Sequence, residues 1–260
     1  MAERPERDPS PAVTRSLRIL TLLAASEGRP LPPAEIARRL GIAKSSTINL
    51  ISALEEGGMI SRTLNGCTLG RATAEIGGAY AEQFNQAREF YSVCEASEVL
   101  RTHVVQMTVL AGVDALYLAR HEGRRRFRLG TPLGSRLPAS LTAAGNAHLM
   151  RMSDQEIITL VGPTEPFPQL TQDSVRDLGG LLEKIRESRR RGYAVDVSES
   201  VHGVTGVAVP LEPWTPSDPP FALGVPLPSE EAGPETIATV AGALQQAADA
   251  LSNPFARSDS

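Results

Sequence analysis

The stretch from Pro30 to Gly70, PLPPAEIARRLGIAKSSTINLISALEEGGMISRTLNGCTLG, decides the fold of the first part of the chain. Because prolines suit the first turn of a helix, a short helix is expected over 33–40, with Gly41 supplying the tight turn after it. A second helix is expected over 44–56, where residues recur with the period of a buried helical stripe. These residues are Thr47, Leu50, Ile51 and Leu54.

Two short strands are expected after this helix, over 59–62 and 67–69. The Asn65-Gly66 pair between them is typical of a tight hairpin turn, because both residues tolerate positive φ. Helix, turn, helix and hairpin in this order predict a winged helix-turn-helix. The alternative is a small helical domain whose second helix only packs or binds protein.

The face of the second helix opposite the buried stripe is small, polar and almost free of acid, as suits a helix that enters the DNA major groove. We expect this face and the hairpin to contact double-stranded operator DNA. In that arrangement Lys44 and Ser45 would bind phosphates and Asn49 would read a base, since asparagine can pair with adenine through two hydrogen bonds. The full set of expected DNA contacts is Lys44, Ser45, Ser46, Ile48, Asn49, Ser52, Arg62 and Asn65.

Composition places the chain among ordinary globular proteins. Its 260 residues are 41% hydrophobic and 22% charged, which suits one or two domains with sizeable cores. No apolar run approaches the roughly 20 residues that span a bilayer, and the start MAERPERDPSPAVTR lacks the apolar core of a signal peptide. We therefore expect a cytoplasmic protein without a membrane partner. Two cysteines make neither a disulfide framework nor a metal motif, and no cofactor is expected.

Charge is spread unevenly along the chain. The formal net charge is −4, yet residues 1–80 carry ten basic against eight acidic side chains, and the remainder carries sixteen against twenty-two. A slightly basic first part on an acidic body fits a DNA reader attached to a domain of another function.

Composition and periodicity divide the chain into five segments. A helix is expected over 13–25 at the start of the first domain, with Val13, Leu17, Leu20 and Ala24 on its buried side. The linker is expected to be helical and bent or broken, because Gly77-Gly78 and a polar run at 82–86 interrupt it. The segments are a flexible tail (1–12), the winged helix-turn-helix (13–72), the linker (73–89), a second domain (90–254) and a tail (255–260).

The second domain mixes strands and helices without strict alternation, which predicts an α+β fold with a mostly antiparallel sheet flanked by helices. Expected strands cover 104–110, 113–120, 124–129, 193–196, 203–209 and 221–227. Expected helices cover 142–152 and 234–251, with two more between them. One begins at the capping box Ser153-Asp154-Gln155-Glu156, and the other is capped by Ser174 and ended by Gly192.

Three ordered stretches carry a resemblance to a known family. They are TRSLRILTLLAASEGRPLPPAEIARRLGIAKSSTINLISALEEGGMI from Thr14, RLPASLTAAGNAHLM from Arg136, and RRRGYAVDVSESVHGVTGVAVPL from Arg189. The chain resembles the IclR-type bacterial transcription regulators from Val13 to Leu251. The resemblance implies a homodimer or dimer of dimers, whose GAF-like C-terminal domain binds a small metabolite, the effector, that changes operator occupancy. A repressor is the commoner form of such a regulator.

The resemblance also implies the positions that line the effector pocket. They fall at the start of a helix, in the loop after Asp196 and on the last strand. An organic acid is one candidate effector, because Arg124, Arg125, Arg126 and Arg128 could attract it, although a solvated basic strand explains them equally well. The implied positions are Ser140, Leu141, Thr142, Asp196, Glu199, Gly203, Thr205, Gly206, Leu223 and Val225.

Some positions depart from the pattern of the family. Asn49 stands where an arginine is common on the recognition helix, which indicates a different operator preference. Gly206 and Thr205 stand where cysteine and arginine are common, which puts the usual effector chemistry in question. Two alternatives remain at this level. One is a winged-helix adaptor that binds protein without an effector, and the other is an enzyme, for which neither a phosphate-binding loop nor a GxSxG elbow is present.

Overall fold

The computed structural model describes residues 8–26, 28–82, 85–124, 131–213 and 218–252. The chain forms two compact units, Met1–Gln83 and Phe84–Ser260, which are described separately below. Within these described ranges, no helix is both long and apolar enough to cross a membrane.

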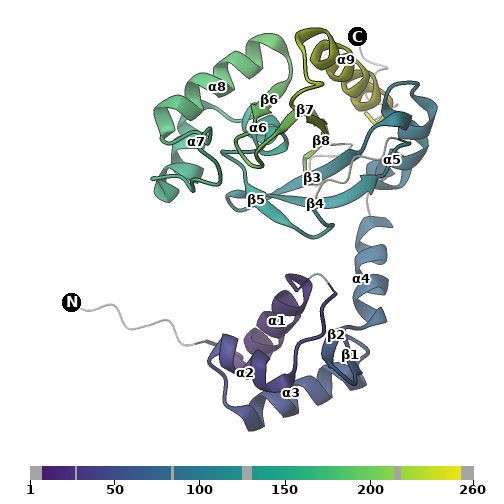
Figure 1. Ribbon diagram of the computed structural model, residues 1–260, viewed down its shortest axis with the longest axis vertical. Helices are drawn as coiled ribbons and strands as arrows, with labels where there is room; N and C mark the ends of the chain where they lie inside the picture. The colour runs from purple at the N-terminus through teal and green to yellow at the C-terminus, as the bar shows by residue number, and fades with distance from the viewer. Residues whose placement is uncertain (1–7, 27, 83–84, 125–130, 214–217, 253–260) are drawn as a thin grey trace. The chain divides into compact units, whose positions relative to one another are not determined.

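The first unit is a winged helix-turn-helix, as the sequence predicts (Figure 1). Gly41 has φ of 63°, the left-handed conformation that glycine adopts without strain, and it turns the chain between the second and third helices. The two wing strands pair antiparallel. The elements are α1 (Pro11–Ala24), α2 (Pro33–Leu40), α3 (Lys44–Glu56), β1 (Ile60–Thr63), β2 (Gly66–Leu69) and α4 (Arg71–Glu82).

The core of this unit lies between α1, α2, α3 and the wing. Thr47 and Ile51 of α3 are buried, and Leu50 and Leu54 pack against the same core. The fully or nearly buried apolar members are Ile19, Leu23, Leu31, Ile36, Ile51, Ile60 and Cys67.

The stripe predicted for α1 is wrong at three of its four residues, and only Leu20 packs against the core. Val13 and Leu17 are 56% and 59% exposed, and Ala24 is exposed as well. The helix instead turns Ile19 and Leu23 into the core, with Leu20 packed beside them. Both sets share the helical period, so periodicity alone could not decide which set meets the neighbouring helices.

The second unit is built on a six-stranded antiparallel sheet with the strand order β5-β4-β3-β8-β7-β6. The expected antiparallel α+β architecture is confirmed. Gly112 makes the turn between the first two strands. The strands are β3 (Val105–Ala111), β4 (Asp114–His121), β5 (Arg136–Pro138), β6 (Ala194–Val197), β7 (Val204–Leu211) and β8 (Phe221–Pro228).

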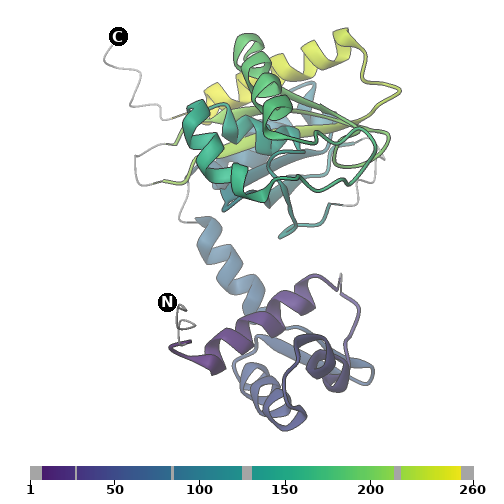
Figure 2. The same ribbon diagram turned by 90° about the vertical axis from the view of Figure 1, so that its left-hand side faces the viewer.

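Helices cover both faces of this sheet (Figure 2). On one face α5 and α9 close the largest core, where Phe90 and Leu244 meet strand residues such as Leu223. On the other face α6 packs its alanines against Ala194, Ala208 and Ala222, and these small side chains let the helix approach the strands closely. The helices are α5 (Asn85–Ala96), α6 (Ala143–Leu149), α7 (Asp154–Val161), α8 (Leu178–Arg191) and α9 (Pro234–Ala250), with 3₁₀ turns η1 (Leu100–Thr102) and η2 (Gly162–Thr164).

Two local expectations for this unit have opposite outcomes. The capping box at Ser153 and Glu156 is confirmed at the start of α7. The cap predicted at Ser174 is wrong, because α8 begins after Asp177, whose side chain accepts the N–H of Gly180 at 2.8 Å. The Ser174 hydroxyl instead donates to the carbonyl of Glu199 at 2.7 Å.

The strand predicted over 124–129 lies almost wholly outside the described residues, as do Arg125, Arg126 and Arg128. Arg124 is in a bend rather than a strand. The short strand β5 was not expected, because 136–138 carries neither alternation nor β-branched residues.

Candidate nucleic-acid interface and small-molecule pocket

The outer face of α3 carries the residues expected to meet DNA. Lys44, Ser45, Ile48, Asn49 and Ser52 are exposed, and Ser46 is half-buried. Ile48 is 50% exposed, an unusual position for an isoleucine unless a partner covers it.

The start of α3 is open to an anion. Its N-cap residue is Ala43, which has no side-chain acceptor, so no side chain caps the N–H groups of the first turn. Uncapped N–H groups at a helix start attract phosphates, and Lys44 adds a positive charge beside them.

Arg62 of the wing strand β1 contacts two side chains of α3. Its Nε lies 2.7 Å from an oxygen of Glu55, and its Nη2 donates to the Ser52 hydroxyl at 2.9 Å. Ser52 and Arg62, both expected to contact DNA, are therefore hydrogen-bonded to each other. Asn65 is exposed at the tip of the wing.

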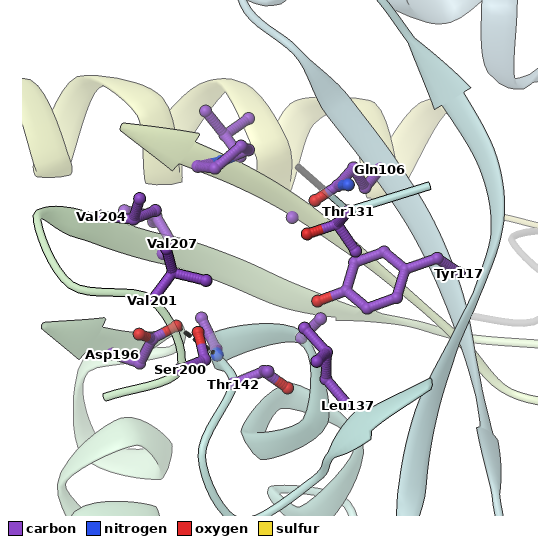
Figure 3. Close-up of a pocket in the computed structure, with 16 residues that line it drawn as sticks. Gln106, Tyr117, Thr131, Leu137, Thr142, Asp196, Ser200, Val201, Val204 and Val207 are labelled. Atoms are coloured by element: carbon purple, nitrogen blue, oxygen red, sulfur yellow. Dashed lines mark hydrogen bonds between the residues drawn. The ribbon is translucent and has the colours of Figure 1, made fainter. Parts of the chain in front are cut away.

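The second unit contains a pocket between the sheet and the start of α6 (Figure 3). It encloses about 400 Å³ of space not filled by atoms, including its opening to solvent. Four of the ten positions expected from the resemblance line it: Thr142, Asp196, Gly206 and Val225. Val204, Gly224 and Pro226 also line it, and they lie within the stretches 203–206 and 223–226 that the resemblance implies. Nine lining residues were not expected, and they are Gln106, Tyr117, Thr131, Leu137, Ala143, Ala144, Ser200, Val201 and Val207.

Asp196, at the third position of β6, supplies the charge of the pocket. Its side chain is buried, at 4% exposure, and its Oδ2 accepts the backbone N–H of Ala143 at 2.8 Å. Burial raises the pKa of this carboxyl to about 6, although the N–H of Ala143 and the charge of Lys184 act to lower it.

Tyr117 approaches the pocket from β4, on the side opposite Asp196 in Figure 3. Its hydroxyl is buried, and burial together with the charge of Asp196 raises its pKa, so Tyr117 stays protonated. It can therefore both donate and accept a hydrogen bond. Thr142, the N-cap of α6, accepts the N–H of Gly145 through its hydroxyl at 3.0 Å.

The other six expected positions do not line the pocket. Glu199 pairs with Lys184 Nζ at 2.6 Å, and the carbonyl of Ser140 accepts from the same ammonium at 3.1 Å. The Thr205 hydroxyl lies 2.9 Å from that of Ser229, and the N–H of Gly203 donates to Ser198. Leu141 and Leu223 are fully buried.

Lys184 of α8 thus joins two segments that flank the pocket. One precedes α6, and the other follows β6 and contributes Ser200 and Val201 to the pocket wall. Sequence reasoning missed this lysine because its partners lie 44 and 15 positions away along the chain.

Two family models match the chain. The IclR helix-turn-helix domain matches residues 12–63, and the bacterial transcriptional regulator IclR C-terminal model matches residues 93–253.

The chain belongs to the IclR family of bacterial transcriptional regulators.

Individual IclR-family relatives agree with this assignment. The HTH-type transcriptional repressor AllR of Escherichia coli strain K12 is 26% identical over 199 residues, covering 76% of this chain and 73% of AllR. The structure of an IclR transcriptional regulator from Alicyclobacillus acidocaldarius has a TM-score of 0.81 at 21% identity. The match covers 94% of this chain and 98% of that protein. The Agobacterium tumefaciens repressor BlcR is 28% identical, with a TM-score of 0.58 and coverage of 95% and 97%. These relatives are regulators rather than enzymes, so the chain is a DNA-binding transcriptional regulator with an effector-binding domain.

Proposed function

We propose that this IclR-family regulator is a repressor whose operator binding is controlled by a small molecule held in the pocket around Asp196. One observation carries the effector part of the proposal. The buried carboxylate of Asp196 lines a mostly apolar pocket together with the polar side chains of Tyr117 and Thr142. A mostly apolar cavity with a few converging polar groups, one of which has a strongly shifted pKa, is typical of a small-molecule site.

For the DNA part, we propose that Lys44 and Ser45 bind phosphates and that Ser46, Ile48, Asn49 and Ser52 face the major groove. Arg62 and Asn65 of the wing would reach the flanking backbone or minor groove. The exposure of the outer face of α3 and its uncapped start support these roles.

The sign of control follows from two relatives. AllR and BlcR are both described as repressors. A solved IclR homologue from Microbacterium hydrocarbonoxydans, with a TM-score of 0.76 and 20% identity, is complexed with 4-hydroxybenzoate, which supports a small-molecule effector in this fold. The organic acid considered from the arginines at 124–128 has little support in the described pocket, because Arg124 is not part of its wall.

We further propose a homodimer or a dimer of dimers. Val13 and Leu17 stand one helical turn apart on α1 and expose apolar surface that a second copy could cover. Sedimentation of the wild type and of Leu17→Glu tests this, and a wild type that sediments as a monomer at micromolar concentration would refute it.

Fluorescence anisotropy on DNA from upstream of the coding region tests the main proposal. Binding should exceed that to a scrambled duplex, fall steeply with salt and weaken in Asn49→Ala. Metabolite fractions are then added to the complex, and those that release DNA from the wild type should act poorly on Asp196→Asn. If no metabolite changes operator binding, the effector-controlled repressor is wrong.

A further inference from the structure

Two polar side chains in the pocket wall have no hydrogen-bond partner within the part of the chain that the structure describes. Gln106 of β3 is 5% exposed, and its side-chain amide forms no hydrogen bond there. Thr131 is 7% exposed, and its hydroxyl is unpaired as well. Because buried polar groups are normally paired, two unpaired ones in one wall require an explanation.

These two groups differ from polar atoms that are sealed inside the core. Nδ1 of His148 and Oδ1 of Asn146 lack a partner and have almost no accessible surface. The amide of Gln106 and the hydroxyl of Thr131 lack a partner too, but they remain accessible from the pocket. Figure 3 shows their oxygen atoms directed into the pocket, on the same side as the hydroxyl of Tyr117. A molecule in the pocket can therefore reach both groups.

The strands beside Gln106 explain why its amide is unpaired. Gly224 of β8 and Arg120 of β4 stand opposite Gln106 in the sheet. Gly224 has no side chain to offer. Arg120 donates to the carbonyl of Thr131 at 3.3 Å and pairs with the carboxylate of Glu122 at 3.1 Å. The amide thus has space beside it rather than a partner.

The charged group on the opposite side of the pocket is already held by the protein. Oδ2 of Asp196 accepts the N–H of Ala143 at 2.8 Å. A Cβ on Gly206 would overlap this oxygen and lie 3.0 Å from the Cβ of Ala143, so any larger residue would push the carboxylate away from the N–H. The absence of a side chain at Gly206 therefore maintains this bond.

Two further polar groups of the wall are also engaged. The Thr142 hydroxyl accepts the N–H of Gly145 at 3.0 Å, and the Tyr117 hydroxyl interacts with Thr142. Among the buried polar side chains of the described wall, Gln106 and Thr131 are thus the ones left for a ligand.

We propose that Gln106 and Thr131 bind the polar group of the effector, and that this group is uncharged and carries a hydrogen-bond donor beside an acceptor, as a carboxamide does. A glutamine amide offers one acceptor and two donors, so it can pair with such a group through two hydrogen bonds. The one charged side chain in the described wall is Asp196, so the wall provides no cation for an acid. This inference rests on the proposed function, in which the pocket holds the effector.

Propionamide and butanone make a matched pair of probes, because butanone has a methyl group where propionamide has its NH₂. Both accept a hydrogen bond at the carbonyl, but only propionamide donates one. The amide also loses more hydration in an apolar cavity, so it binds more tightly than the ketone only if the pocket supplies partners. Their dissociation constants are measured by saturation-transfer difference NMR on the full chain. We expect propionamide to bind at least about fivefold more tightly.

Three variants assign this preference to the two residues. Gln106→Met keeps the length of the side chain but removes the amide, so the ratio of dissociation constants should fall to one or below. Thr131→Val keeps the shape without the hydroxyl and should lower the ratio less. Gln246→Met makes the same change as Gln106→Met on the exposed side of α9 and should keep the wild-type ratio. Circular dichroism checks folding, and each ratio compares two probes on one protein.

The proposed role is overturned by any of three results. These are butanone binding to the wild type as tightly as propionamide, a wild-type ratio that survives in Gln106→Met, and no saturable signal from propionamide.

Failure of the proposed function is read in the operator assay instead. If no metabolite changes operator binding while the preference for propionamide depends on Gln106, the pocket binds a ligand without controlling the operator. A metabolite that releases operator DNA equally well from the wild type and from Gln106→Met leaves the repressor standing and refutes the role of Gln106.

Discussion

On α3, the residues proposed to meet DNA lie between Lys44 and Ser52, and all but Ser46 are exposed. The pocket, in contrast, draws its wall from positions between Gln106 and Pro226, and its charged group is buried. The first surface is one face of one helix, whereas the second exists only after the sheet and α6 have assembled. Side chains on the first can change with little effect on folding, while those on the second affect folding and binding together.

Two isoleucines of α3 allow the contribution to folding to be measured separately from the contribution to DNA binding. Ile51 is fully buried and Ile48 is 50% exposed. Ile51→Ala should lower the free energy of unfolding by about 3–4 kcal/mol, because it leaves a cavity in the core of the first unit. Ile48→Ala should change it by less than about 0.5 kcal/mol and weaken operator binding instead. Urea denaturation and anisotropy measure the two effects, and equal destabilisation by both would contradict the comparison.

Two lysines compare the effect of substitution on stability near the pocket and on the outer face of α3. Lys184→Met leaves Glu199 buried without its cation, so we expect a loss of about 3 kcal/mol in the free energy of unfolding. Lys44→Met removes an exposed charge and should leave stability within about 0.5 kcal/mol. Chemical denaturation of both variants is the measurement. A Lys184→Met protein as stable as the wild type would show that the pair does not hold the segments flanking the pocket.

The cost of burying Asp196 should appear in the pH dependence of stability. Its pKa rises from 3.8 to about 6 on folding, so between these values the unfolded chain releases the proton first and the folded state loses stability as pH increases. We expect Asp196→Asn to gain about 2–3 kcal/mol relative to the wild type between pH 3.5 and pH 7. Denaturation curves at several pH values test this, with Asp249→Asn as the control. A constant difference between Asp196→Asn and wild type would refute it.

Asn49 should have the smallest effect on folding and a clear one on recognition. Asn49→Ala is expected to weaken operator binding by about 1–3 kcal/mol and to relax the preference for one base, with stability unchanged. Binding to a set of single-base operator variants measures this. A uniform loss over all variants would assign Asn49 to a phosphate rather than a base.

The first unit follows closely from its sequence, because its decisive signals are local. The period of α3, the turn at Gly41 and the Asn65-Gly66 hairpin each act within a few residues. The error on α1 shows the limit of this reasoning, since Val13 and Leu17 fit a stripe as well as Ile19 and Leu23 do. Only the position of the neighbouring helices decides between them.

The pocket could be only partly predicted, because the sequence does not show which distant elements pack against each other. Thr142, Asp196, Gly206 and Val225 came from the resemblance to a family. Tyr117 was missed because strand alternation shows that it shares a face with Ala115, but does not show which helix covers that face. Lys184 was missed because an ion pair between a helix and a loop has no sequence period. A buried aromatic hydroxyl in a predicted core strand was the one available signal.

The missing side chain at Gly206 also bears on how this regulator can diverge. Every amino acid that a single nucleotide change can put in place of glycine is larger, and each would displace the Asp196 carboxylate. Under the proposed function, in which this pocket holds the effector, one mutation can therefore alter which compound the protein senses while the DNA-reading unit stays as it is. Copies of such a gene could acquire new inducers before they acquire new operators.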